Sequence, residues 1–268
     1  MIDGIPVALA AELAQALALP SPAQGTDTPA DITVTRSHGE TCVIYGTRRL
    51  DVSNDLELFI LLATLVPACL MDKVDLSRRL HAAGIRVGKK ALLVSGEGRM
   101  GKSSISLTAW LRGYEILGDD WLLFSNDYLG MFPIPKPLKP RMTVEQFATL
   151  KRSPRAESAV FGRLLEENRA LIGRHEGFCN DWDKPVPVGA MIFLDRSDRE
   201  APKLERIAVS EALPLFLSQT ILCRNSQTLA GVAFARALAS ANVPVYQLDL
   251  GASSPDEALD EILEKIET

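Results

Sequence analysis

The chain has 268 residues, of which 47% are hydrophobic, so it is long enough to bury a sizeable core. Its formal net charge of −5 at pH 7 argues against a broad basic surface, and no nucleic-acid partner is expected. The four cysteines lie far apart without a C-x-x-C pair. This favours reduced thiols over a zinc site or a disulfide framework and predicts a cytoplasmic protein.

Residues 1–74 are predicted to form a small N-terminal α+β region. An apolar, alanine-rich stretch over 5–19 predicts a helix, and it makes a poor signal peptide because no basic segment precedes it. A Pro- and Gly-rich linker follows at 21–30. Three short β-like segments then predict an antiparallel meander: 32–35, 42–45 and 49–52. Substrate recognition and a subunit contact are both open as roles for this region.

An apolar run at 58–71 follows the meander. Asn54 and Glu57 form a capping-box pattern that opens a helix ahead of this run. The run is too short to span a bilayer and contains Pro67, so it predicts a buried helix rather than a membrane segment. No membrane partner is expected.

The second predicted domain, 75–268, contains the most informative motif of the chain. Eight consecutive residues match the phosphate-loop pattern G-x-x-x-x-G-K-[ST]: Gly96, Glu97, Gly98, Arg99, Met100, Gly101, Lys102 and Ser103. A buried strand is predicted before the loop at 91–94, and a helix after it at 104–112, closed by Gly113. The motif therefore has the strand–loop–helix context that a nucleotide-binding loop requires.

Each part of this motif has a role in holding a phosphate chain. The glycines let backbone N–H groups point inward, and the positive end of the helix, which begins with Ser104, faces the anion. Lys102 can reach the β- and γ-phosphates, and the Ser103 hydroxyl can ligate Mg²⁺. The motif predicts nucleotide binding with ATP and Mg²⁺ as the cofactors, while ADP or pyrophosphate stays open as the phosphate donor.

Asp119 and Asp120 lie between predicted strands at 114–117 and 121–124, about one helix and one strand beyond Lys102. Adjacent carboxylates repel each other unless a cation or a shared proton relieves them. Beside a bound nucleotide, one can hold Mg²⁺ and the other can accept a proton from an attacking hydroxyl. Without other motifs, the pair would be interpreted as a solvated turn. The phosphate loop upstream favours the interpretation that the pair belongs to a phosphoryl-transfer site.

The rest of the chain alternates extended and helical patterns. The predicted elements are an extended Pro-rich segment at 132–141, helices from Thr143 (capped with Gln146) and from about Ser158, a strand at 190–194, helices near 211–222 and 227–241, a strand at 243–248 and a last helix capped by Ser254 and Glu257. Lys139 and Arg141 are candidate phosphoryl or substrate contacts, because the Pro-rich backbone holds them stiffly. The neighbouring basic residues, Lys136 included, are expected on a solvated surface.

Asp195 offers an alternative metal ligand. It ends a run of apolar residues at 191–194 and so imitates the acidic residue of an ordinary ATPase strand. If Asp195 held Mg²⁺, the pair Asp119 and Asp120 would be incidental.

The order of these features resembles the catalytic core of the HPr kinase/phosphorylase family. The resemblance covers about 78–124 and rests on Leu80-His81-Ala82, the strand and loop from Ala91 to Gly96, Gly101-Lys102-Ser103-Ser104 and Leu117-Gly118-Asp119-Asp120. It is closer still, in outline, to divergent HPr-kinase-related proteins. It implies an α/β fold with a P-loop kinase core of the phosphoenolpyruvate-carboxykinase type and a mixed sheet, rather than a doubly wound ATPase.

The resemblance also implies a role for each matching residue. His81 would lie near the transferred phosphate, Lys102 and Ser103 would bind phosphate and metal, Asp119 would assist the metal, and Asp120 would be the base that activates a serine hydroxyl. Relatives of this family often form oligomers, so a homo-oligomer is compatible with it.

Two departures separate the chain from that family's pattern. Arg99 stands at the fourth loop position, where the family usually has Gly, and Gly98 comes one place early. The chain also lacks the downstream Glu-x-Arg-Gly-type segment typical of true HPr kinases. HPr itself and phosphorolysis are therefore not expected. Related kinases act on other serines, including the C-terminal serine of lasso-peptide precursors, and such a peptide fits this chain.

The sequence thus predicts an ATP-dependent kinase that transfers the γ-phosphate to a serine-type hydroxyl of a peptide or protein, with Mg²⁺ and an Asp general base. Two alternatives stay open. One is a nucleotide-binding regulatory module or slow ATPase without transfer to a hydroxyl, and the other is a kinase for a small molecule such as free serine.

Overall fold

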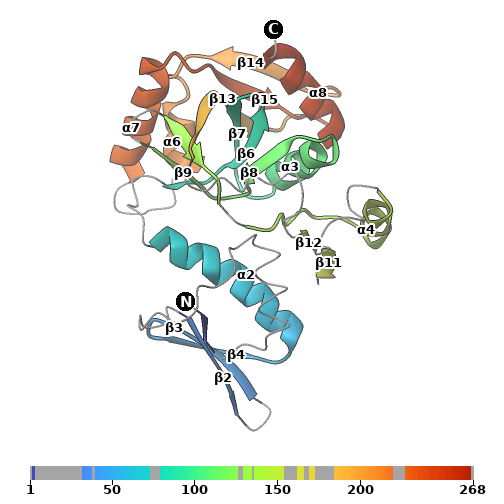
Figure 1. Ribbon diagram of the computed structural model, residues 1–268. Helices are drawn as coiled ribbons and strands as arrows, with labels where there is room; N and C mark the ends of the chain where they lie inside the picture. The colour runs from blue at the N-terminus through green and yellow to red at the C-terminus, as the bar shows by residue number, and fades with distance from the viewer. Residues whose placement is uncertain are drawn as a thin grey trace.

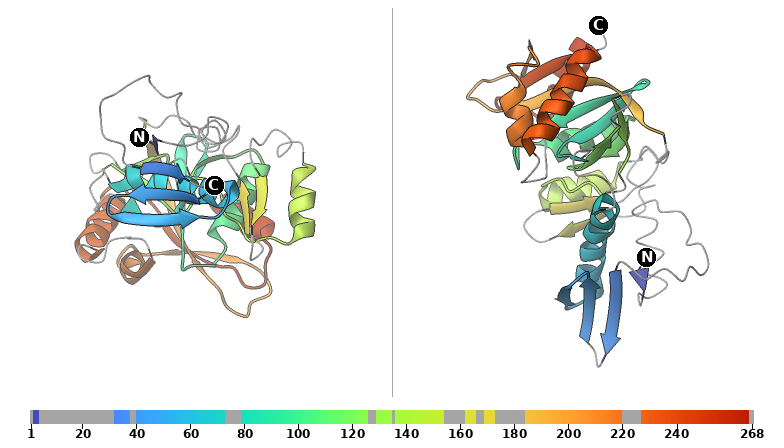
Figure 2. Two further views of the ribbon diagram at one scale, coloured as in Figure 1. Left: turned by 90° about the horizontal axis from the view of Figure 1, so that it is seen from below. Right: turned by 90° about the vertical axis from the view of Figure 1, so that its left-hand side faces the viewer.

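The computed structural model describes residues 2–3, 32–37, 40–72, 79–125, 129–134, 136–153, 162–165, 169–172, 184–219 and 227–266. The helix predicted over 5–19, the linker at 21–30 and the boundary between 74 and 75 lie outside the described residues. Along the molecule, a small N-terminal sheet, one long helix and a larger α/β body follow one another (Figures 1 and 2).

The N-terminal sheet confirms the predicted meander. It contains β1 (Ile2–Asp3), β2 (Ile32–Ser37), β3 (Glu40–Tyr45) and β4 (Arg48–Val52), in that spatial order. β2, β3 and β4 pair antiparallel, and β1 adds to β2 in parallel. Ile32 and Val34 of β2, Val43 of β3 and Val52 of β4 are buried in one hydrophobic cluster, so the sheet presents an apolar face.

Helix α2 (Asp55–Asp72) covers that face. The Asn54 half of the predicted capping box is present, because its side chain accepts a hydrogen bond from the Glu57 N–H at 2.9 Å. The Glu57 carboxylate accepts one at 2.7 Å from the N–H of Ser53, the residue before the cap. Leu58, Phe59 and Leu62 are fully buried against the sheet, which confirms the predicted core helix.

None of the helices that the structure describes combines the length and the apolar character needed to cross a bilayer.

The larger body is built on a nine-stranded mixed sheet. Its strands are β5 (Arg79–Leu80), β6 (Ala83–Val87), β7 (Lys90–Ser95), β8 (Glu115–Gly118), β9 (Leu122–Phe124), β10 (Gly130–Phe132), β13 (Val186–Asp195), β14 (Lys203–Ile207) and β15 (Val245–Asp249). β13 lies parallel to both β7 and β15, whereas the outer strands pair antiparallel. The predicted mixed α/β sheet is confirmed; the relation to phosphoenolpyruvate carboxykinases stays a prediction.

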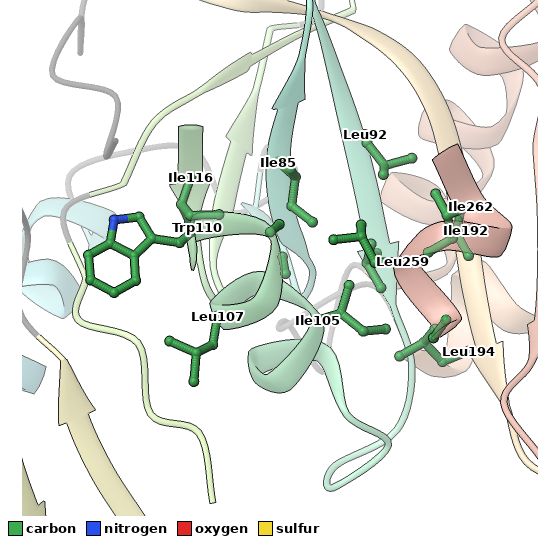
Figure 3. Packing of buried hydrophobic residues seen from close by; sticks show 14 of the residues in the cluster. Ile85, Leu92, Ile105, Leu107, Trp110, Ile116, Ile192, Leu194, Leu259 and Ile262 are labelled. Atoms are coloured by element: carbon green, nitrogen blue, oxygen red, sulfur yellow. The ribbon is translucent and has the colours of Figure 1, made fainter. Parts of the chain in front are cut away.

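Helices cover both faces of this sheet (Figure 1). α3 (Lys102–Leu111) and α8 (Pro255–Ile266) lie on one face, and α6 (Leu213–Gln219) and α7 (Gln227–Ser240) on the other. Leu92 and Val94 of β7 therefore pack toward α3 and α8 (Figure 3), while Leu93 packs toward the opposite layer. A strand buried on both faces has the continuous apolar run seen at 91–94.

Strands β5, β6, β10 and β14 of this sheet are absent from the sequence prediction. The most consequential is β6, which pairs antiparallel with β7 on one side and with β8 on the other. Because both neighbours run opposite to β6, β7 and β8 run in the same direction and end at the same edge of the sheet. Residues at their ends pair with the first residues of β6: Val94, next to last in β7, with Ala83, and Gly118, the last of β8, with Gly84.

The Pro-rich segment after β10 is extended, as predicted, and leads into α4 (Val144–Lys151). Thr143 and Gln146 form the predicted capping box of that helix. Where the predicted helix from about Ser158 enters the described residues, it is wrong: β11 (Gly162–Leu165) and β12 (Arg169–Ile172) form an antiparallel hairpin. The reason is a tertiary partner, because the backbone of Ile172 exchanges two hydrogen bonds of 3.0 Å with Leu138.

Candidate active site

The topology of β6, β7 and β8 brings three separate motifs to one edge of the sheet. His81 precedes the first residue of β6, the loop 96–101 follows β7, and Asp119 and Asp120 follow β8. The antiparallel strand β6 between two parallel ones is therefore the physical reason for their convergence.

A cavity of about 280 Å³ lies at this edge. We call it the loop cavity, and its lining residues are His81, Gly98, Arg99, Gly101, Lys102, Ser103, Ser104, Asp120, Lys139 and Arg141. Every one of them is a predicted site residue, from four segments distant in sequence. The remaining predicted residues, Gly96, Glu97, Met100 and Asp119, do not line the cavity. The structure brings these residues together; their roles stay predictions.

The N-terminus of α3 faces the loop cavity with Ser103 and Ser104. Gly101 is the N-cap residue, and its φ of 108° is a backbone conformation that glycine adopts most readily. No side chain caps this end, and its first turn contains no acidic residue. The partial positive charge of the helix end is thus not offset by its own side chains, which suits an anion.

Lys102 is the first residue of α3 and is only 4% exposed. Its Nζ donates hydrogen bonds to the carbonyl oxygens of Gly96 at 2.7 Å and Glu97 at 3.1 Å, so it holds the start of the loop. Burial lowers the pKa of Lys102 below its usual value, and the charges of Asp119 and Asp120 oppose this effect. An additional anion beside this buried ammonium would stabilise its charged form.

Arg99 gives the loop a strained backbone. Its φ of 74° lies in the left-handed region that Gly favours, whereas the adjacent Gly98 has no positive φ. The position at which the sequence departs from the resembled family is therefore the one whose backbone suits glycine. The Arg99 side chain lines the loop cavity and adds a positive charge to it.

We expect the variant Arg99→Gly to be more stable than Arg99→Ala by about 1 kcal/mol, because only glycine adopts this φ without strain. Both variants lack the guanidinium, so the difference isolates the backbone from the charge. Midpoints of urea unfolding measure it. An Ala variant as stable as the Gly variant would show that Arg99 is not strained.

Asp120 is the carboxylate that reaches the loop cavity. Its side chain is 32% exposed, its Oδ2 lies 2.9 Å from Lys136 Nζ, and its Oδ1 lies 3.9 Å from His81 Nε2. Burial acts to raise its pKa, but the charge and hydrogen bond of Lys136, with His81 and Lys102, outweigh burial and hold the pKa below its usual value. With its φ of 64°, Asp120 is, after Arg99, the second non-glycine residue of the site in the left-handed region.

Lys136 corrects the sequence prediction of a solvated surface. It is 5% exposed, forms the ion pair with Asp120, and places its ammonium 4.4 Å from the centre of the Trp121 ring. The Pro-rich segment carries it there because the Ile134 N–H donates to the Leu117 carbonyl at 2.9 Å, beside the end of β8. The available signal was that only apolar residues and prolines flank Lys136 between Phe132 and Leu138.

Asp119 is fully buried behind the loop cavity. Burial, with the neighbouring charge of Asp120, raises its pKa to about 6, and Lys136, the Ser103 hydroxyl and the Lys139 N–H act in the opposite direction. The Lys139 N–H lies 3.5 Å from Oδ2, while Oδ1 is buried without a hydrogen-bond partner. An unpartnered buried carboxylate oxygen next to the Ser103 hydroxyl fits a hard cation such as Mg²⁺.

Lys139 connects the site to the N-terminal region. Its backbone N–H approaches Asp119, and its Nζ donates a hydrogen bond of 2.9 Å to the Thr64 hydroxyl in α2. One residue thus links the long helix to the loop cavity, as α2 lies next to the larger body in Figure 1. Arg141 also lines the cavity and is exposed.

Asp195 lies away from these groups. It is exposed at the end of β13, where its Oδ2 accepts a hydrogen bond from Gln247 Nε2 at 2.8 Å and its Oδ1 accepts one from the Arg196 N–H at 2.8 Å. Asp195 does not line the loop cavity. The geometry therefore favours the Asp119–Asp120 pair over Asp195 as the acidic part of the site.

Comparisons with known proteins give a weak structural similarity and no match in sequence. No protein-family model and no curated protein matches the chain. Among solved structures, it is similar to the Hpr(Ser) kinase/phosphatase from Coxiella burnetii, with 14% sequence identity and a TM-score of 0.28 over 62% of this chain and 93% of that chain. A similarity this low assigns neither a family nor an activity, so the function has to be inferred from the residues of the loop cavity.

Proposed function

We propose that the protein is a kinase that transfers the γ-phosphate of ATP to a serine-type hydroxyl of a peptide or protein. The single observation that carries the proposal is the loop cavity. It joins an uncapped helix N-terminus and a buried lysine, which suit a phosphate chain, to a carboxylate that suits a hydroxyl.

The phosphate side of the cavity acts through positive charge. In the proposed reaction, the first N–H groups of α3 and the Lys102 ammonium bind the phosphate chain, and Arg99 and Arg141 add charge at the rim. Because these groups are fixed before the substrate arrives, they stabilise the charge on the transferring phosphoryl group without reorganising.

The acceptor side of the cavity acts through Asp120. The acceptor oxygen forms a bond to the γ-phosphorus, the bond from that phosphorus to the β,γ-bridging oxygen breaks, and ADP leaves. Asp120 takes the hydroxyl proton, and Lys136 keeps this carboxylate ionised until it does so. Asp120 and His81 are 32% and 27% exposed, so a hydroxyl carried on a peptide chain can approach from solvent.

Ser103 and Asp119 are the residues that would hold Mg²⁺, with phosphate oxygens supplying further ligands. Bound there, the ion would neutralise charge on the β- and γ-phosphates. Among the residues that the structure describes, no group of three or more His, Cys, Asp or Glu side chains is arranged to hold a metal.

Incubation with γ-labelled ATP, Mg²⁺ and a panel of serine-containing peptides tests the proposal. We expect label on a peptide hydroxyl. Label released only as inorganic phosphate would instead support a regulatory module or slow ATPase. In a parallel incubation with free serine in place of the peptides, label on serine would support a small-molecule kinase.

A further inference from the structure

We propose that a second hollow, the α3–α4 groove, binds the nucleoside part of the phosphate donor. The donor is then a nucleoside polyphosphate rather than pyrophosphate or a polyphosphate chain. This inference rests on the proposed function of the loop cavity and names the chemistry of its donor.

The α3–α4 groove has a volume of about 560 Å³, within the range of small-ligand sites. Its lining residues are Ser104, Leu107, Thr108, Leu111, Pro140, Arg141, Met142, Glu145, Gln146, Thr149, Leu150, Ser153, Pro255 and Asp256. Those from α3 recur every three or four residues and so share one face of that helix. In Figure 3, Leu107 points away from Ile105, which faces the sheet core, so this face is turned toward the groove.

The groove is continuous with the loop cavity. Ser104 and Arg141 line both hollows. Ser104 belongs to the first turn of α3, where a phosphate chain would be bound, so a group attached to that chain can pass Ser104 and enter the groove. His81 and Asp120 line the loop cavity and not the groove, so the acceptor hydroxyl and the groove occupant use different parts of the site.

The chemistry of the groove suits a neutral nucleoside. Leu107, Leu111 and Met142 offer apolar surface to a planar base, and hydroxyl groups such as that of Thr149 can bond to its polar edge. Glu145 also lines the groove, as does Asp256, which is paired with Arg112 at 2.8 Å. Because Glu145 and Asp256 offset the charge of Arg141, the lining of the groove has no excess of positive charge to bind a second phosphate group or an acidic peptide.

Calorimetric titration of the full chain with Mg-ADP and with Mg-pyrophosphate tests the inference. These probes share a diphosphate and differ in the nucleoside. We expect the wild-type protein to bind ADP at least about tenfold more tightly than pyrophosphate. The variant Thr149→Trp, which fills the groove from an exposed position on α4, should remove this preference and leave the pyrophosphate affinity unchanged.

Val144→Trp is the matched control, because Val144 lies on the same helix, is 60% exposed and does not line the groove. It should preserve both affinities. Equal affinities of the wild-type protein for ADP and pyrophosphate would overturn the groove assignment and leave the proposed function standing, and this comparison needs no variant. Binding of neither probe would overturn both. A Thr149→Trp variant that keeps its ADP affinity and binds peptide more weakly would assign the groove to the acceptor and overturn the inference.

Discussion

Replacing Asp120 with Asn is expected to lower the rate of phosphoryl transfer by about 10²- to 10⁴-fold, the usual contribution of a general base, while Mg-ATP affinity changes by less than about threefold. Asn cannot accept the hydroxyl proton, but it has the size of Asp and tolerates the left-handed backbone at this position, where φ is 64°. The substitution therefore removes the proton acceptor and keeps the side-chain size and the backbone conformation. It also removes the charge that pairs with buried Lys136, so the free energy of unfolding of the variant is measured beside its activity.

The measurement is single-turnover transfer of label from γ-labelled ATP, together with calorimetric binding of Mg-ATP. Asp195→Asn is the matched control, since it makes the same chemical change at the alternative metal ligand. It should leave transfer within about twofold, because Asp195 does not line the loop cavity. Unchanged transfer by the Asp120 variant would show that Asp120 is not the general base. Loss of transfer in the Asp195 variant alone would place the acidic part of the site at Asp195.

Replacing Asp119 with Asn is expected to stabilise the metal-free protein at pH 8 and to change how its stability depends on pH. The folded-state pKa of Asp119 is about 6, against an ordinary value of 3.8. Below pH 3.8 the carboxyl is protonated in both states and contributes nothing. Between pH 3.8 and about 6 the folded state binds more protons, so stability falls as pH rises. Above about pH 6 the full destabilisation, on the order of 3 kcal/mol, is present.

Urea unfolding in EDTA at pH 5 and pH 8 measures this effect. Wild-type protein should lose more free energy of unfolding between the two values than Asp119→Asn does, and the variant should be more stable at pH 8 by about 1–2 kcal/mol. This gain in free energy of unfolding is smaller than the destabilisation by the Asp119 charge, because burying the polar Asn amide also costs free energy. The same variant should lose Mg-dependent transfer. Identical pH dependence of the two proteins would show that Asp119 has an ordinary pKa.

The sequence predicts those parts of the site that have a local signature. The strand before the loop, the helix after it and the pair Asp119 and Asp120 each depend on a short pattern of apolar, Gly and acidic residues. The caps of α2, α4 and α8 are predictable for the same reason, since a capping box spans four residues. All three are present in the structure.

The parts that the sequence does not predict depend on distant partners. In β6, Ala83, Ile85 and Val87 alternate with Gly84 and Arg86, which is the period of a strand, but the run is only five residues long. Its pairing with neighbours on both sides places it in the sheet. Lys136 is buried because Asp120 and Trp121, which precede it by about one strand and one loop, supply an anion and an aromatic face. The neighbours of β6 and the partners of Lys136 are set by the tertiary fold, which no local pattern in the chain specifies.

The most direct test of the central claim is a ³¹P NMR time course of the wild-type protein with Mg-ATP and, in turn, each serine peptide of the panel that is incubated with γ-labelled ATP. A transferase predicts that the γ-phosphate signal is replaced, one for one, by a phosphoserine monoester signal, with ADP as the other product. Accumulation of inorganic phosphate with every peptide, and no monoester signal, would contradict transfer to a hydroxyl at the loop cavity.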